Sequence, residues 1–152
     1  MPIRADLNDL ADIIAFQHLV YAENRAIIGV EPIPLMVDYK DIFFRMEFWI
    51  DGFANDIDGV AIIDLVQNKT SNDLYLWSIA TNPQRRNRGI GNKLLHFVED
   101  RARELGHSSI SLSTNSLLKD RVAWYSRHGF AITHHETMSD RVVVHMRKLL
   151  EK

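Results

Sequence analysis

The stretch from Ile79 to Val98 constrains this chain most, because three local signals follow one another there without a break. An apolar run that ends at Thr81 is typical of a β-strand and leads directly into the turn NPQRRNRGIG. An amphipathic pattern over about 91–105 follows the turn and predicts a helix. The sequence therefore predicts a strand, a tight turn, and a helix whose N-terminus faces the turn.

The turn has the composition of an anion site. Gly89 and Gly91 let the backbone bend sharply and come close to a ligand. The first N–H groups of the following helix lie at the positive end of its dipole, where phosphate binds well. Arg85, Arg86 and Arg88 add positive charge. The local chemistry indicates a pyrophosphate cradle, and the alternative is an ordinary connection that carries solvated arginines.

Spacing distinguishes this turn from two other phosphate-binding motifs. The P-loop string G-x-x-x-x-G-K-[ST] does not occur in the chain. The dinucleotide pattern G-x-G-x-x-G/A fails because its third small position is Leu94, which is too large for close helix packing. From Pro83 to Gly91 the turn has the form P-x-x-R-x-x-G-x-G. This string resembles the acyl-CoA-binding motif of the GNAT superfamily of N-acyltransferases.

A second block carries the same resemblance. The segment AWYSRHGF, residues 123–130, is similar to the fourth helix of that family and the strand after it. Gly129 suits a helix C-cap, and Phe130 begins the next strand. In the family the matching tyrosine lies near the CoA sulfur and acts as general acid, which implies that role for Tyr125. The alternative is an aromatic residue at the edge of the core whose hydroxyl has a local partner.

The two ends of the chain extend the resemblance. PIRADLNDLADI is similar to the opening strand and first helix of the family, and VVVHMRKLL to its last strand. The resemblance is weakest over residues 17–58. It implies one domain over residues 1–152 with an α+β fold, in which helices flank a mixed, mostly antiparallel sheet. Hairpins of antiparallel strands also argue against a doubly wound parallel fold.

Local patterns place the remaining elements. Asp6 is a good N-cap for a helix that begins near Leu7 and runs into the twenties. The helix after the turn should bury a stripe of Leu94, Leu95, Val98, Ala102 and Leu105. We further expect a helix over 36–44, a helix that carries Tyr125, a turn over 52–58, a hairpin loop over 67–73, and strands over 3–5, 48–50, 59–66, 74–81, 108–114, 130–134 and 141–146.

Composition excludes several kinds of chemistry. The 152 residues contain no cysteine, so disulfides, Cys-ligated zinc and a cysteinyl acyl-enzyme are excluded. The formal net charge of −2 gives no reason to expect nucleic-acid binding. His134 and His135 are neighbours on a predicted strand and point to opposite faces, and no H-x-x-x-H occurs, so we expect no metal site. Without a visible signal peptide or membrane span, we expect a cytoplasmic protein.

The resemblance implies a reaction and a cofactor site. An amine attacks the thioester of acetyl-CoA directly, and Tyr125 protonates the departing thiolate. The backbone of Ile79–Thr81 pairs with the pantetheine arm, and an N–H near Ile79 or Ala80 polarises the thioester oxygen. The residues expected to hold the cofactor are Ile79, Ala80, Thr81, Arg86, Asn87, Arg88, Gly89, Ile90, Gly91, Asn92 and Asn115.

Asn115 departs from the family spacing. The family often has an asparagine about seven residues before the tyrosine, where it contacts the pantetheine arm. That position is Leu118 in this chain, and Asn115 comes earlier. Asn115 therefore takes the role from the end of its strand, or the role is vacant.

The general base and the acceptor stay open. Asp73, Asp64, Glu47, His134 and His135 are candidate bases, but a structural or surface role suits each better, so we expect a water-mediated path and name no base. The family's acceptor lies between the first two helices and the last strands. That region offers residues that suit either an amine cradle or a core and homodimer interface: His18, Tyr21, Glu23, Tyr39, Phe43, Phe44, Trp49 and Phe53.

The sequence is compatible with three functions. The leading hypothesis is an N-acetyltransferase that moves an acetyl group from acetyl-CoA to a primary amine. Polyamine, amino acid, antibiotic and protein amines all remain candidate acceptors. The alternative is a catalytically silent protein that binds or senses acyl-CoA. A nucleotide-binding module of another kind is disfavoured, because the P-loop and dinucleotide patterns are missing.

Overall fold

The computed structural model describes residues 1–65 and 72–151. Its sheet has seven strands in the order β1-β2-β3-β4-β5-β7-β6. Strands β4 and β5 are parallel, and the other paired strands are antiparallel. The elements are β1 Ile3–Arg4, η1 Leu7–Asp9, α1 Leu10–Ala22, α2 Asn24–Ile28, η2 Ile33–Leu35, α3 Tyr39–Phe43, β2 Met46–Phe53, β3 Asp56–Asp64, β4 Asp73–Thr81, η3 Pro83–Arg85, α4 Ile90–Glu104, β5 Ser109–Asn115, α5 Lys119–Arg127, β6 Ala131–Thr137 and β7 Val142–Leu149, where η denotes a 3-10 helix. The predicted α+β class with a mostly antiparallel sheet is confirmed.

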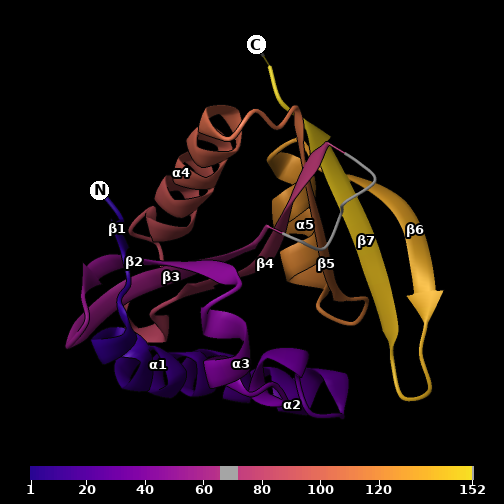
Figure 1. Ribbon diagram of the computed structural model, residues 1–152. Coiled ribbons are helices and arrows are strands. Elements are labelled where there is room, and N and C mark those ends of the chain that lie inside the picture. Colours follow the sequence, from indigo (N-terminus) through magenta and orange to yellow (C-terminus); the bar gives the residue numbers. More distant parts are fainter. Residues whose placement is uncertain (66–71, 152) are drawn as a thin grey trace.

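Two hydrophobic cores cover opposite faces of the sheet. Along β3, Val60 and Ile62 pack with α1 and α3, whereas Ala61 and Ile63 pack with α4 and α5. This alternation follows from the two-residue period of a strand. In Figure 1, α1, α2 and α3 lie on one side of β2–β4 and α4 lies on the other.

Helix α4 packs closely on β3. A Cβ at Gly59 would meet Leu94 Cδ1 at 2.7 Å, so this strand position requires glycine. Leu94, Leu95, Val98 and Ala102 are buried as predicted. Leu105 is 38% exposed, so its place in the predicted stripe was wrong. The helix has already ended at Leu105, which is its C-cap.

The β2–β3 hairpin is longer than the sequence suggested. Pairing continues to Phe53 and Asp56, so the predicted turn over 52–58 was wrong. A register shift between Asp51 and Gly52 makes this possible, and Gly52 has a φ of +92° that favours glycine.

Strands β6 and β7 also extend three residues beyond their predicted ends. Most of the predicted 67–73 loop lies outside the described residues.

The helix predicted over 36–44 is shorter in the structure. Asp38 is its N-cap and accepts a hydrogen bond from the Lys40 N–H, so α3 begins at Tyr39. Residues 36–38 therefore belong to the connection from η2 to α3.

Strands β4 and β5 separate part-way along their length. Their parallel pairing runs from Asp73↔Ser109 to Leu76↔Leu112 and stops there. A register shift on the β3 side leaves Trp77 without a Cα partner in β3. Beyond this point β4 continues with β3, and β5 continues with β7 (Figure 1). The strands thus open a gap beside residues 77–81.

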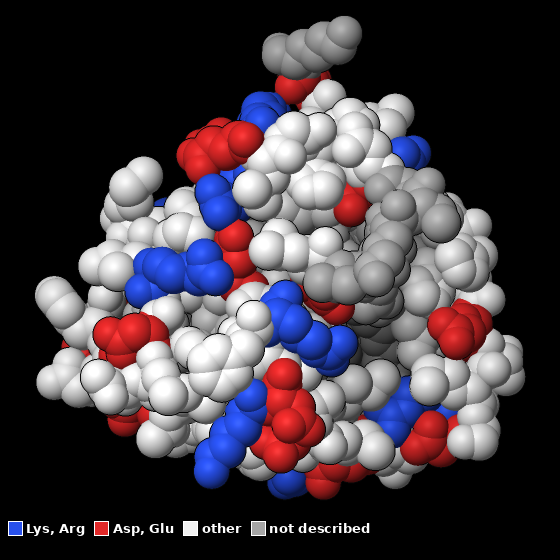
Figure 2. Space-filling view, in the orientation of Figure 1, with Lys and Arg blue, Asp and Glu red and all other residues white. Residues whose placement is uncertain are grey.

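The visible surface carries mixed charges. Lys and Arg are interspersed with Asp and Glu on the face shown in Figure 2. Among the described residues, no helix has both the length and the apolar character needed to cross a membrane.

Candidate functional site

Two cavities meet where β4 and β5 separate. The outer groove, of about 820 Å³, lies between the turn before α4, the end of α1, and α5. The inner cavity, of about 230 Å³, lies between α2, η2 and the strands β4, β5 and β7. The residues that line both are Asn24, Ile79, Leu118, Arg121 and Tyr125. These five residues therefore place the two cavities side by side, with Tyr125 and Arg121 in the wall between them.

The turn presents backbone N–H groups to the outer groove. Asn87 and Gly89 have φ values of 65° and 74°, in the left-handed region, and they bend the chain into α4. The first hydrogen bond within α4 runs from the Lys93 N–H to the Gly89 carbonyl, 3.0 Å. The N–H groups of residues 90–92 thus have no acceptor inside the helix. This arrangement suits an anion, as the sequence predicted.

The arginines of the turn contribute less free charge than expected. Arg85 forms ion pairs with Asp56 and with Asp58, the latter at 2.5 Å, and so fastens the turn to β3. Arg86 pairs with Glu23 across the outer groove, and both side chains are about half exposed. Such exposed pairs are weak, so an incoming phosphate can take the place of Glu23.

The structure gathers most of the predicted cofactor residues along one groove. Ala80 is in the core with 1% exposure, and only its backbone can act. Arg88 is exposed and lines neither cavity, and Asn115 lines only the inner cavity. The predicted residues that line the outer groove are Ile79, Thr81, Arg86, Asn87, Gly89, Ile90, Gly91 and Asn92.

Tyr125 lies in the wall that the two cavities share. It is 5% exposed, and its ring packs against Phe130 and Trp124. Burial raises the pKa of Tyr125 to about 12, although the positive charge of Arg121 opposes the rise. Within the described part of the chain, its hydroxyl makes no hydrogen bond that would tie it to a structural role.

Arg121 is a site residue that the sequence reasoning missed. It is half-buried, lines both cavities, and lies over the ring of Tyr21 at 5.6 Å. Among the described residues it has no ion pair with a carboxylate. The available signal was its position four residues before Tyr125, since residues at this spacing share one face of a helix.

Trp124 is a second residue of the outer groove that the sequence reasoning did not identify. A Cβ at Gly91 would meet Trp124 Cζ2 at 3.2 Å, so α4 and α5 approach closely at the groove. The pattern of the turn explained Gly91 by ligand approach alone. The structure adds a packing reason for the same glycine.

The residues expected near the acceptor separate into different places. Tyr21 lines the inner cavity, and its hydroxyl is 2.6 Å from Ser78 Oγ. Tyr39 lies in the core behind it and donates to the Pro34 carbonyl, 2.7 Å. Glu23 lines the outer groove. The others line neither cavity: His18, Phe43, Phe44, Trp49 and Phe53.

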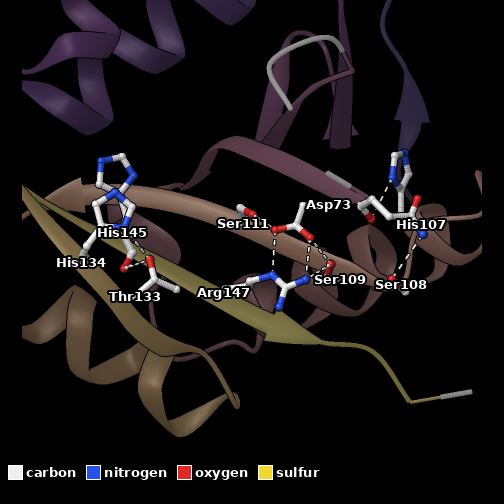
Figure 3. A network of polar contacts seen from close by, with 10 residues as sticks. Asp73, His107, Ser108, Ser109, Ser111, Thr133, His134, His145 and Arg147 are labelled. Carbon is white, nitrogen blue, oxygen red and sulfur yellow. Dashed lines mark hydrogen bonds and ion pairs between the residues drawn. The ribbon is translucent and has the colours of Figure 1, made fainter. Parts of the chain in front are cut away.

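Asp73 is a structural carboxylate. Figure 3 shows it accepting hydrogen bonds from Arg147, Ser109 and Ser111. Burial raises its pKa, but these hydrogen bonds outweigh burial and bring the pKa to about 2. Asp73 is therefore a poor proton acceptor near neutral pH.

The remaining candidate bases also lie outside both cavities. Burial would raise the pKa of Glu47, but hydrogen bonds from Arg101 and Trp49 lower it. His134 stacks on His145 at 4.3 Å on the exposed side of the β6–β7 hairpin (Figure 3). His135 and Asp64 line neither cavity. No group of three His, Asp or Glu among the described residues could hold a metal ion.

Solved structures share this architecture. An acetyltransferase of the GNAT family from Staphylococcus aureus Mu50 is 18% identical over 99% of each chain, with a TM-score of 0.78. The ribosomal-protein-S18-alanine N-acetyltransferase from Escherichia coli is 15% identical over 100% of this chain and 94% of its own, with a TM-score of 0.76. PaiA N-acetyltransferase from Thermoplasma acidophilum, in complex with coenzyme A, is 14% identical over 98% of each chain, with a TM-score of 0.74. At these identities the likeness shows the fold.

The sequence itself carries the family assignment. No curated protein matches the chain in sequence. The family described as "Acetyltransferase (GNAT) family" matches residues 15–130, which include both the turn before α4 and Tyr125. This match covers well over half of the chain, and the chain belongs to the acetyltransferase (GNAT) family.

Proposed function

We propose that this chain is an N-acetyltransferase that moves an acetyl group from acetyl-CoA to a primary amine of a small molecule or protein. One observation carries the proposal: the anion cradle at α4 opens on a groove that meets a second cavity at Tyr125. A two-substrate transfer needs such an arrangement, with a long anionic donor on one side and an acceptor on the other. The PaiA structure, which holds coenzyme A on the same fold, supports this choice of donor.

The chain offers matching groups along the length of acetyl-CoA. The N–H groups of residues 90–92 suit its pyrophosphate. The edge of β4 from Trp77 to Thr81, which β5 leaves unpaired, suits the amides of the pantetheine arm. Backbone N–H near Ile79 or Ala80 then suits the thioester oxygen. The thioester would lie at the wall shared by the two cavities.

The chemistry at that wall is a direct displacement. The neutral amine forms a bond to the carbonyl carbon, and the carbon–sulfur bond breaks. Tyr125 donates a hydrogen bond to the thiolate that leaves and acts as its general acid. Positioning and electrostatics supply the rest of the acceleration.

Proton removal from the amine cannot be assigned to a carboxylate of the inner cavity. An alkyl amine has a pKa near ~10.4 and is mostly protonated at neutral pH. No Asp or Glu is among the described residues that line the inner cavity. We therefore assign proton removal to water, which the Tyr21 and Ser78 hydroxyls can hold.

The missing carboxylate also favours one alternative, an acyl-CoA-binding protein without turnover. Release of free thiol from acetyl-CoA over a panel of amines, with mass analysis of each product, separates the two. The enzyme releases thiol and yields an acetylated amine. Acetyl-CoA binding without thiol release from any amine would support the silent binder.

A further inference from the structure

The inner cavity carries charge of one sign. Its charged lining residues are Arg121 and Arg141, and no carboxylate is among the described residues that line it. Its volume of about 230 Å³ is below the roughly 300–1,000 Å³ of sites for drug-sized ligands. The cavity is therefore suited to a small acceptor. Its two arginines disfavour an acceptor whose only charged groups are positive.

The two arginines differ in how their charge is used. Arg141 is paired with Asp140 at 2.9 Å and donates to the Glu31 carbonyl, so it fastens the β6–β7 end to the segment before η2. Arg121 has no carboxylate partner among the described residues and lies over the face of Tyr21. Arg121, next to Tyr125, is therefore the arginine of the cavity without a direct ion pair among the described residues, and its charge interacts with Tyr21, Tyr125 and Glu23.

Asn115 supplies an independent observation. Its Oδ1 accepts a hydrogen bond from the Leu117 N–H, 2.9 Å, which fixes the orientation of the amide. Its Nδ2 is buried and has no hydrogen-bond partner in the described part of the chain. An unpaired buried donor destabilises a fold, and Asn115 lines the inner cavity but not the outer groove. Asn115 therefore contributes an unused hydrogen-bond donor beside this cavity.

From these contacts we infer that the acceptor is a small amine that also bears a carboxylate, an amino acid in the broad sense. The carboxylate accepts hydrogen bonds from Arg121 and Asn115 Nδ2, while the amine faces the shared wall at Tyr125. The inference rests on the proposed function and narrows its acceptor.

Matched amine pairs test the inference. Thiol release is measured with β-alanine against β-alaninamide, glycine against glycinamide, 4-aminobutyrate against its amide, and putrescine as a dication. We expect the best acid to exceed its amide at least about tenfold in kcat/KM, which is about 1.4 kcal/mol. With CoA bound and no turnover, that acid should also raise the melting temperature more than its amide does. Amides or putrescine that perform as well as the acids, or a panel in which no acid reacts or binds, would overturn the inference.

Three variants locate the effect. Asn115→Asp keeps the acceptor for the Leu117 N–H and replaces the free donor with a negative charge, so the acid preference should disappear. Arg121→Gln should also remove it, whereas Arg45→Gln, an exposed arginine that lines neither cavity, should keep it. An acid preference that persists in Asn115→Asp and Arg121→Gln would refute the assignment.

Calorimetry with acetyl-CoA alone keeps the two proposals apart. If acetyl-CoA fails to bind the wild-type protein, the proposed function fails. If it binds and amides react as well as acids, only the acceptor assignment fails.

Discussion

Removing the hydroxyl of Tyr125 tests its role in the departure of the thiolate. Burial brings the pKa of Tyr125 to about 12, whereas a thiol titrates near ~8.5. Complete proton transfer is then uphill by roughly 3.5 pKa units, or about 5 kcal/mol at 1.36 kcal/mol per unit. The main benefit should be a hydrogen bond to the developing thiolate, which is worth about 1.5–3 kcal/mol for a charged partner. Tyr125→Phe should therefore lower kcat by about 10- to 100-fold.

Single-turnover thiol release at saturating acetyl-CoA measures this loss. Affinity for acetyl-CoA, measured by calorimetry, should change little because the ring remains. Tyr39→Phe is the matched control, since it removes a buried hydroxyl behind the inner cavity and should lower stability without lowering the rate. Turnover near wild type in Tyr125→Phe, with chemistry rate-limiting, would show that Tyr125 only packs the wall.

Three further changes test the fold and the groove. Asp73→Asn should cost about 2 kcal/mol of unfolding free energy at pH 7, because contacts such as Arg147 hold the Asp73 pKa at about 2. This stabilisation is present above pH ~4 and is lost as pH falls toward 2, so an equal wild-type advantage in denaturant melts at pH 7 and pH 2 would contradict it. Gly59→Val should lower the denaturant midpoint by the equivalent of about 1–3 kcal/mol through overpacking against α4, and an unchanged midpoint would refute that contact. Gly91→Val should weaken acetyl-CoA binding in calorimetry because its side chain meets Trp124, and normal affinity would make the turn a mere connector.

The sequence was most informative where neighbouring residues alone determine the local structure. The turn from Pro83 to Gly91 combines helix-start chemistry with glycines, so an anion site could be predicted there from the sequence, and the structure places this turn along the outer groove. Asp38 sets the start of α3 as its N-cap, and the apolar pattern over 36–44 did not indicate this boundary. Leu105 fitted the helical spacing but lies at the helix end, where the stripe meets solvent.

Features that depend on tertiary contacts were beyond such rules. Arg85 resembled a phosphate ligand until the fold placed Asp56 and Asp58 beside it. Arg121 had no motif, and its importance comes from the absence of a carboxylate partner among the described residues. The separation of β4 and β5 occurs beside a register shift near Trp77, and no residue pattern in the sequence predicted that shift. These ion pairs and strand pairings join residues that are far apart in the sequence, so local patterns could not predict them.

Calorimetric titration of acetyl-CoA into the wild-type protein and Gly89→Val tests the central claim most directly. Gly89 is the N-cap of α4 with a φ of +74°, which a β-branched residue resists, and it lines the outer groove. We predict one acetyl-CoA per wild-type chain, a stabilisation of about 2.7 kcal/mol at 100 times Kd, and a large loss of affinity in Gly89→Val. Folded wild-type protein that gives neither heat nor a melting shift at millimolar acetyl-CoA would contradict the claim.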